Sequence, residues 1–306
     1  MVERVEAVEF IRRMRGGSQP QMVRCSNGHY YIAKFQNNPQ GKRVLANELI
    51  GTLLAKHLGL PVGEMAIVNV SDILIRDTDD AVVQLQRSRI PYQHGLCFGS
   101  RLIGDIDRQG YLCHGVVPDC VRGRISNPRD FLGMLVFDQW TCNIDNRQAV
   151  LVRNAEDDGL VVVMMDNGDC FNRSKWTFPD CPTRGLVCGA QTYHQVESIN
   201  NFEPWLTKLE RENDISVLRQ FGEMVPEEWY DGDKDSLDRL LVELRRRCQI
   251  VRSLILRTLS RHLNEFPRFG SSKSERVALP LFSVDALNHY GAHPTVQRSM
   301  AKSRLT

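Results

Sequence analysis

Residues 127–168 read NPRDFLGMLVFDQWTCNIDNRQAVLVRNAEDDGLVVVMMDNG, and this stretch decides the fold. Asn127 and Pro128 are typical first residues of a helix, and apolar side chains then recur at helical spacing. Asp138 falls on the apolar face, so we expect it to be buried and hydrogen-bonded. After a polar loop we expect a strand, a turn and a second strand buried on both faces, at 149–152, 154–159 and 160–165.

A hairpin between two acidic loops folds both loops back to the same end. Asp145 lies in the loop before the hairpin and Asp166 directly after it, so the two carboxylates are expected to converge. One carboxylate could accept a proton while the other holds Mg²⁺ against the phosphates of ATP. The alternative is that Asn167 and Gly168 form an ordinary turn and that Asp145 is a solvated loop acid.

The N-terminal third contains a glycine-rich turn and a lysine inside a strand. Gly16, Gly17 and Ser18 lie in a turn between two expected strands, where backbone N–H groups can approach phosphate oxygens. An ordinary turn is the alternative. Lys34 interrupts the apolar strand 30–35, and a charge in a strand interior needs an anionic partner.

The helix expected at 42–58 carries Glu48 beside its apolar stripe, and Gly59 ends it. A strand lysine followed by a helix glutamate is the arrangement that holds the lysine on ATP phosphates in protein kinases. A solvated helix acid is the alternative for Glu48. The order Lys34, Glu48, Asp145, Asp166 favours the functional interpretation.

Several motifs in this order resemble those of HipA-like kinases of the smaller bacterial type, which are related in fold to protein and phosphoinositide kinases. The resemblance implies an α+β, two-lobed, protein-kinase-like fold, with a small β-rich N-lobe containing one helix and a larger, mainly helical C-lobe. The matching segments are GGSQP at 16–20, YIAKF at 31–35, LANEL at 45–49, GLCFGS at 95–100, FDQW at 137–140, NID at 143–145 and DNG at 166–168, with a looser match at PEEW, 226–229.

The resemblance also implies a role for each matched residue. Lys34 would neutralise the phosphates of ATP, and Glu48 would orient Lys34. Asp145 would be the base on the attacking hydroxyl, and Asp166 would hold Mg²⁺. The acceptor implied is a protein serine or threonine, and an antitoxin-like partner is a further implication.

A rival register uses Asp138 and Asn143, because they have the spacing of the base and metal-binding asparagine of kinases. We reject this register because Asp138 points from a helix face, whereas Asp145 lies in the loop. Asp138 is then expected to support that loop.

One departure from the family pattern concerns the second metal ligand. The family usually has an asparagine five residues after the base, and this chain has Val150. Gln148 or Asn146 could supply the missing oxygen, and Gln148 is our predicted ligand beside Asp166. The departure keeps two alternatives open, namely a nucleotide-binding pseudokinase and a scaffold that only keeps the fold.

Three regions are expected along the chain. Residues 1–90 form the N-lobe, 91–265 the C-lobe, and 266–306 a flexible tail whose serines could accept phosphate. The strand at 81–86 would lead to the hinge, with adenine bound near Gln86. The segment 95–100 is expected to be a loop near the nucleotide.

Composition excludes several classes of protein. No apolar run among the 306 residues approaches a membrane span, and the first residues are too charged for a secretory signal, so we expect a cytoplasmic protein. The nine cysteines include no Cys-x-x-Cys pair, which argues against a zinc ribbon or a disulfide scaffold. A net charge of +2 argues against direct nucleic-acid binding. The basic run 245–247 lies on an expected long helix and is interpreted as a solvated face, with docking of an acidic partner as the alternative.

Overall fold

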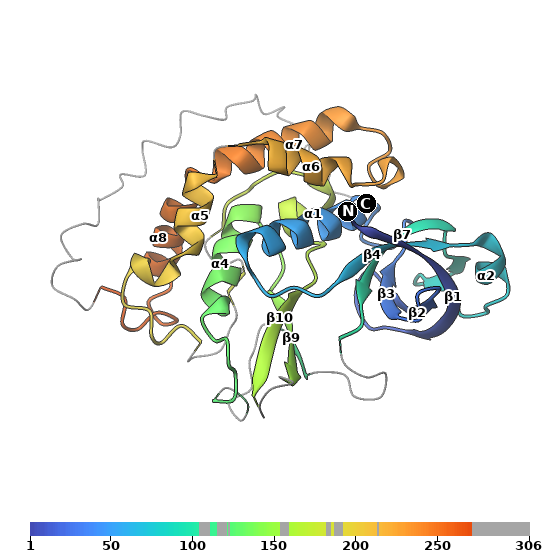
Figure 1. Cartoon of the computed structure of the whole chain (residues 1–306), viewed down its shortest axis with the longest axis horizontal. Helices are drawn as coiled ribbons and strands as arrows, with labels where there is room; N and C mark the ends of the chain where they lie inside the picture. The colour runs from blue at the N-terminus through green and yellow to red at the C-terminus, as the bar shows by residue number, and fades with distance from the viewer. Residues whose placement is uncertain are drawn as a thin grey trace, which may run out of the picture. The chain divides into compact units, whose positions relative to one another are not determined.

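Five strands of the N-terminal part close into a barrel in the order β1-β2-β3-β7-β4 (Figure 1). Closure leaves no strand edge open to pair with another chain. β1 runs antiparallel to β2 and parallel to β4, which completes the ring. The strands are β1 (Glu3–Arg13), β2 (Gln21–Cys25), β3 (Tyr30–Lys34), β4 (Met65–Val70) and β7 (Gly95–Arg101).

The computed structural model describes residues 1–103, 111–114, 121, 123–153, 159–181, 185–186, 192–212 and 214–270, with the backbone alone at 111–114. The chain divides into two units, Met1–Phe269 and Gly270–Thr306. Every helix and strand named below lies in the first unit.

The strands and turns predicted for the first 35 residues are confirmed, but the segment 95–100 is a strand rather than a loop. β2 and β3 pair antiparallel across the turn at 26–29. β7 pairs with both β3 and β4. Gly99 within this strand allows close packing. A Cβ on Gly99 would lie 2.5 Å from Cγ2 of Val68 on the neighbouring strand, so only glycine fits there.

The predicted region boundaries stay predictions, although two structural features differ from them. β7 belongs to the barrel, so the N-terminal sheet continues beyond residue 90. The tail predicted from residue 266 begins with a buried residue, since Phe266 is fully buried and its ring packs on Tyr193 at a centroid distance of 4.9 Å. The remainder of the predicted tail, 271–306, lies outside the described residues.

α1 (Arg43–Leu58) is the helix predicted at 42–58, and it is buried along most of its length. It contacts β7 on one side and α5 and α6 on another, so it lies between the barrel and the C-terminal helices (Figure 1). Gly59 ends it with φ 83°, a left-handed conformation that glycine adopts without strain. α1 can therefore carry side chains to the barrel and to the loops of the C-terminal part.

The deciding stretch forms α4 (Asp130–Thr141), β9 (Gln148–Arg153) and β10 (Leu160–Met165), and the two strands pair antiparallel as predicted. β8 (Tyr111–His114) adds to β9 as a third strand. Two details differ from expectation. Asn127 does not cap α4, because its amide bonds the backbone of Val162 instead (2.8 and 3.0 Å). β10 alternates between buried and partly buried residues, so only one face is fully covered. The predicted turn, apart from Gly159, lies outside the described residues.

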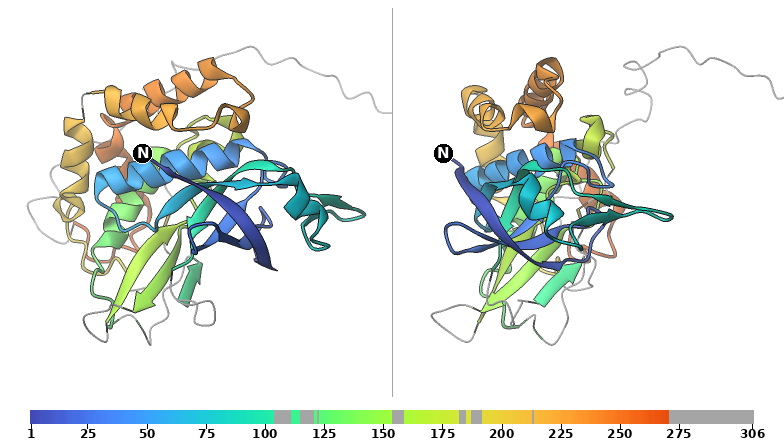
Figure 2. Two further views of the ribbon diagram at one scale, coloured as in Figure 1. Left: turned by 45° about the vertical axis from the view of Figure 1, so that its right-hand side comes forward. Right: turned by 90° about the vertical axis from the view of Figure 1, so that its right-hand side faces the viewer.

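The other helices form the rest of the structure, and a small arm projects from the barrel (Figure 2). The arm consists of α2 (Asp72–Arg76) and a separate hairpin of β5 (Val82–Gln84) and β6 (Arg89–Pro91). The remaining elements are η1 (Cys170–Lys175), η2 (Ile199–Phe202), α5 (Trp205–Arg211), α6 (Ser216–Glu223), η3 (Glu227–Trp229), α7 (Lys234–Arg247) and α8 (Val251–Arg261).

The long helix expected near the C-terminal end is two helices, α7 and α8, and its basic run is not entirely solvated. Arg247 is buried, and its guanidinium donates to the carbonyl oxygens of Trp140 (2.7 Å) and Gln139 (2.8 Å) at the end of α4. It also pairs with Asp180 at 2.7 Å. The end of α7 is therefore fixed to α4 by a buried charge.

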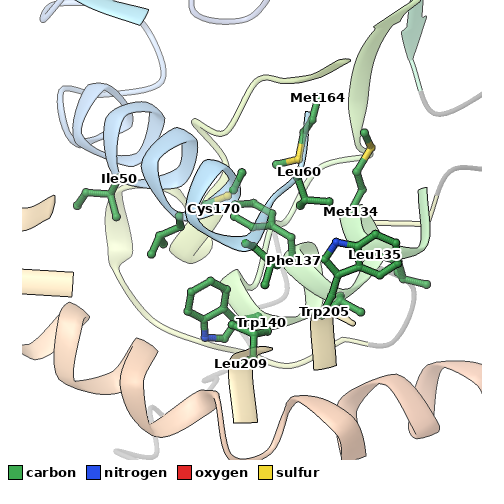
Figure 3. Close-up of a cluster of buried hydrophobic side chains, with 14 of the residues drawn as sticks. Ile50, Leu60, Met134, Leu135, Phe137, Trp140, Met164, Cys170, Trp205 and Leu209 are labelled. Atoms are coloured by element: carbon green, nitrogen blue, oxygen red, sulfur yellow. The ribbon is translucent and has the colours of Figure 1, made fainter. Parts of the chain in front are cut away.

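The main core lies where α1, α4 and α5 meet (Figure 3). Phe137, Trp140 and Leu135 of α4 pack there with Trp205 and Leu209 of α5. A second cluster fills the barrel. The deciding stretch thus supplies both the central helix of the core and the two acidic loops.

Gly133→Ala should lower the free energy of unfolding, although alanine favours a helix by about 0.5–1 kcal/mol over glycine. A Cβ at position 133 would lie 2.4 Å from Trp205 and 2.6 Å from Leu60. Overpacking of this kind usually destabilises by about 1–3 kcal/mol. Urea unfolding measures the change. Gly123→Ala is the matched control, since a Cβ there meets nothing within 4 Å. A Gly133→Ala protein as stable as the parent would contradict this packing.

Candidate active site

A cavity of about 410 Å³ lies where the barrel, α1 and the two acidic loops meet. Met14, Gln40, Phe98 and Met164 are among its other lining residues. The residues predicted for the site that line it are Gly16, Gly17, Ser18, Lys34, Glu48, Asp145, Gln148 and Asp166. The two acidic loops and the glycine-rich turn therefore line one cavity.

Gln86 is the predicted site residue that the structure places elsewhere. It is exposed in the turn between β5 and β6, which pair only with each other and not with the barrel. The barrel strands that border the site are β3, β4 and β7. The end of β7, Ser100 and Arg101, lines a second, mainly apolar cavity of about 110 Å³ with Met14, Ile32, Leu102, Ile103, Val150, Met164 and Met165. The prediction that the strand at 81–86 leads out of the barrel to the hinge is wrong, because residues 82–84 pair only with residues 89–91, and Gln86 lines neither of the two cavities.

Lys34 is held between two carboxylates at the floor of the cavity. Its ammonium pairs with Glu48 and, at 2.8 Å, with Oδ1 of Asp166. The side chain of Lys34 is 11% exposed, that of Glu48 3% and that of Asp166 31%. Asp166 is therefore the member of this triad that solvent or a ligand can reach.

The shared lysine affects the two carboxylates differently. Burial raises the pKa of Glu48 to about 7, against the opposing effect of Lys34. Burial also acts on Asp166, but Lys34 outweighs it and lowers the pKa of Asp166 to about 2. Burial lowers the pKa of Lys34, yet the two carboxylates outweigh it and the net shift is upward. Asp166 is thus an anion at neutral pH, the form that a metal ligand requires.

Glu48 also fixes the loop that carries Asp166. Its Oε2 accepts the N–H of Asn167 at 2.9 Å, and its Oε1 accepts the N–H of Gly168 at 3.0 Å. A Cβ on Gly168 would lie 2.7 Å from Val44 and 3.0 Å from the carboxylate of Glu48. The glycine of this motif therefore allows α1 to approach the loop closely.

Arg147 joins the two acidic loops, and no role was predicted for it from the sequence. It is 1% exposed and pairs with Asp138, which is fully buried, with its Nε 3.1 and 3.0 Å from the two carboxylate oxygens. Its Nη1 donates to the carbonyl oxygens of Met165 (2.9 Å) and Asp166 (3.2 Å) and to Oδ1 of Asn167 (3.0 Å). One guanidinium therefore holds the loop that carries Asp166 to α4.

Asp138 supports the other loop through Asn143, as the sequence predicted. Its Oδ1 accepts from Nδ2 of Asn143 at 3.0 Å, and Oδ1 of Asn143 accepts the N–H of Asp145 at 3.2 Å. Burial raises the pKa of Asp138, and Arg147 opposes that shift. The positions of Asp145 and Asp166 are thus coupled through a continuous buried network.

Asn47, on α1, is the second residue whose role was missed. Its amide is fully buried and lies within hydrogen-bonding distance of the carbonyl oxygens of Gly168 (2.9 Å), Cys170 (3.0 Å) and Arg173 (3.0 Å). Its oxygen accepts from Nε1 of Trp176 at 2.7 Å. The available signal was its place beside Glu48, since a polar residue on a buried helix face needs partners.

Gln148 and Asp166 are the metal ligands predicted from the sequence. Both line the cavity, whereas Val150 lies within β9, paired with Val163, and offers no oxygen from its side chain. Asn146 is exposed and is not among the lining residues. In the described part of the chain, no three His, Cys, Asp or Glu side chains gather into a metal site. This donor set fits Mg²⁺, which usually takes one or two protein ligands and completes its shell with water and phosphate oxygens.

Two solved structures resemble this fold over most of the chain. Hydra Fam20 with sugar superposes with a TM-score of 0.52 at 12% identity, over 88% of each chain. The proinflammatory kinase CtkA of Helicobacter pylori superposes with a TM-score of 0.50 at 13% identity, over 86% of this chain and 100% of its own. These similarities define a kinase-like fold of mixed α and β structure.

The family model for HipA-like kinases matches residues 7–262. The chain therefore belongs to the HipA-like kinase family, as its motifs indicated. A comparison with the curated proteins finds no match. Among the described helices, none is long and apolar enough to cross a membrane.

Arg147→Met should lower the free energy of unfolding by about 3–5 kcal/mol, because it leaves the carboxylate of Asp138 buried without its partner. The double variant Arg147→Met/Asp138→Leu removes both charges and should recover much of that loss. Urea unfolding of the parent, both single variants and the double variant completes the cycle. If the single losses simply add in the double variant, the two side chains do not form the buried pair described here.

Proposed function

We propose that this chain is an ATP-dependent kinase that transfers the γ-phosphate to a hydroxyl group, with a protein serine or threonine as the acceptor. The observation that carries the proposal is that Lys34, Asp145 and Asp166 line one cavity with the glycine-rich turn. Membership of the HipA-like kinase family supports a phosphotransferase of the kinase type. We also propose that the chain has two lobes, one formed by the barrel and α1 and the other by the helical part.

In the proposed binding mode, the nucleotide occupies both cavities. The apolar cavity between the end of β7 and Met164 would take the base, since its walls are mainly aliphatic. The larger cavity would take the phosphates, which then lie beneath the backbone of Gly16 and Gly17 and near Lys34. This orientation directs the γ-phosphate toward Asp145.

Each residue has a role in the transfer. Asp166 and Gln148 would hold Mg²⁺, which when bound neutralises charge on the phosphate oxygens. Lys34 attracts the phosphates, and Glu48 keeps its ammonium in place. Asp145 accepts the proton of the attacking hydroxyl as the new O–P bond forms and ADP leaves.

A pseudokinase is the second candidate function, and Val150 is the observation that favours it. Val150 lies inside β9, so no amide occupies the position where the family usually has its metal-binding asparagine. A pseudokinase would bind nucleotide without transferring phosphate. The acceptor hydroxyl, an antitoxin-like partner and a cytoplasmic location stay predictions from the sequence.

Thermal unfolding with ATP should test the nucleotide site. Binding to the native state alone stabilises it by about 2.7 kcal/mol at a hundredfold excess over the dissociation constant. We expect ATP with Mg²⁺ to raise the melting temperature of the parent, and we expect Lys34→Ala and Asp166→Ala to lose most of the shift. Gln86→Ala is the control and should respond like the parent. If ATP shifts no variant with or without Mg²⁺, the kinase proposal is wrong.

Asp145→Asn should reduce transfer by about a hundredfold to ten-thousandfold, the contribution of a general base, while it leaves ATP binding unchanged. Transfer is measured from γ-labelled ATP into casein and into myelin basic protein, with phosphoamino acid analysis of the product. A parent that binds ATP but labels neither protein and releases no ADP would favour the pseudokinase. Equal transfer by parent and variant would rule out Asp145 as the base.

A further inference from the structure

Residues 169–174 follow the loop that carries Asp166 and run alongside the loop that carries Asp145. The N–H of Ile144 donates to the carbonyl oxygen of Asp169 at 3.1 Å, and the N–H of Asn172 donates to that of Cys142 at 3.4 Å. Arg173 is therefore carried on a segment bonded directly to the loop of the predicted base. On its other side, Ser174 donates to the carbonyl oxygen of Gln40, which lines the phosphate end of the cavity (3.2 Å).

This segment has an unfavourable backbone conformation. Phe171, Asn172 and Arg173 all have positive φ, at 59°, 56° and 61°, and Arg173 combines its φ with a ψ of −131°. Residues other than glycine rarely adopt such angles, at a free-energy cost of about 1–3 kcal/mol each. The buried amide of Asn47 holds the carbonyl oxygens of Cys170 and Arg173 and so maintains the shape. Strained backbone of this kind is found mainly at functional sites, which suggests a function for this segment.

The side chain of Arg173 is fixed at one end and open at the other. Its Nε donates to Asp169, whose side chain is only 8% exposed, whereas that of Arg173 is 42% exposed. Within the described residues, Nη1 and Nη2 of Arg173 have no hydrogen-bond partner. A guanidinium held by Nε presents its two terminal NH₂ groups as a ready fork for the oxygens of an anion.

Of the other cations near the predicted base, two are already paired with carboxylates, and Arg15 lines the cavity beside the glycine-rich turn. Lys34 is shared by Glu48 and Asp166, and Arg147 is buried against Asp138. The pKa of Arg173 is raised chiefly by its hydrogen bond to Asp169, with smaller effects from Asp145 and Asp166. Its charge therefore acts on both carboxylates between which a transferring phosphoryl group would lie.

We propose that Arg173 contacts the transferring γ-phosphoryl group through Nη1 and Nη2. In the transfer, the acceptor oxygen forms a bond to the γ-phosphorus while the bond from that phosphorus to the β–γ bridging oxygen breaks. ADP leaves with the electron pair, and the acceptor proton passes to Asp145. Negative charge spreads over the equatorial oxygens of the phosphoryl group during this step, and an arginine there stabilises it. This inference rests on the proposed kinase function.

The test compares ATP with ADP, which differ by the γ-phosphate. Isothermal titration calorimetry in Mg²⁺ measures both affinities for the parent, Arg173→Gln and Arg173→Gly. We expect each variant to weaken ATP binding by about tenfold or more, the loss expected for hydrogen bonds to a charged group, and to leave ADP affinity unchanged. The matched control is Arg246→Gln, which removes another exposed arginine paired with a nearby acid, Glu243, on the same helix. It should bind both nucleotides like the parent.

The glycine variant separates a phosphate contact from a structural role. Glycine adopts positive φ without strain, so Arg173→Gly should be at least as stable as Arg173→Gln in thermal unfolding and should still lose the preference for ATP. Equal losses of ATP and ADP affinity, or no loss of either, would overturn the inference. So would unchanged nucleotide affinities with a raised KM for casein, since Arg173 would then contact the acceptor. A parent that binds neither nucleotide contradicts the proposed function itself.

Discussion

The structure depends on one lysine ammonium held between two carboxylates from distant parts of the chain. Lys34 comes from β3, Glu48 from α1 and Asp166 from the loop after β10, and the three meet with little exposure of the lysine. A buried ammonium is stable only with such partners, and a carboxylate left alone there would be costly. The barrel, α1 and the hairpin must therefore be assembled before all three charges are satisfied.

The surrounding polar residues keep this arrangement fixed. Asn47 holds residues 168–173 to α1, and Arg147 holds the loop that carries Asp166 to α4. The C-terminal part is also hydrogen-bonded to the barrel. Oε1 of Glu228 accepts the N–H of Leu96 at 3.1 Å, and Nε1 of Trp229 donates to the carbonyl oxygen of Leu96 at 2.9 Å. These contacts hold Lys34 and Glu48 in their ion pair, and charged groups fixed in this way are preorganised for charge neutralisation.

The sequence predicted those site residues whose charge is unusual for their position in a helix, strand or loop. Lys34 in a strand interior and the acids at the two ends of a hairpin are conspicuous, because a charge in such a position requires a partner. Arg147 was missed although its main partner, Asp138, is only nine residues away and was itself expected to be buried. Asn47 was missed because its partners are mainly backbone carbonyl oxygens far along the chain, which no local pattern indicates. Gln86 was misplaced for a similar reason, since residues 82–84 look like a barrel strand and only long-range pairing distinguishes β7 from them.

The most direct measurement is a crystal structure grown with Mn²⁺ and a non-hydrolysable ATP analogue, with the metal located by anomalous scattering. The account predicts an anomalous peak between Asp166 and Gln148, phosphates beside Lys34, and the base in the apolar cavity at the end of β7. A nucleotide bound elsewhere, or a metal bound without contact to Asp166, would contradict it.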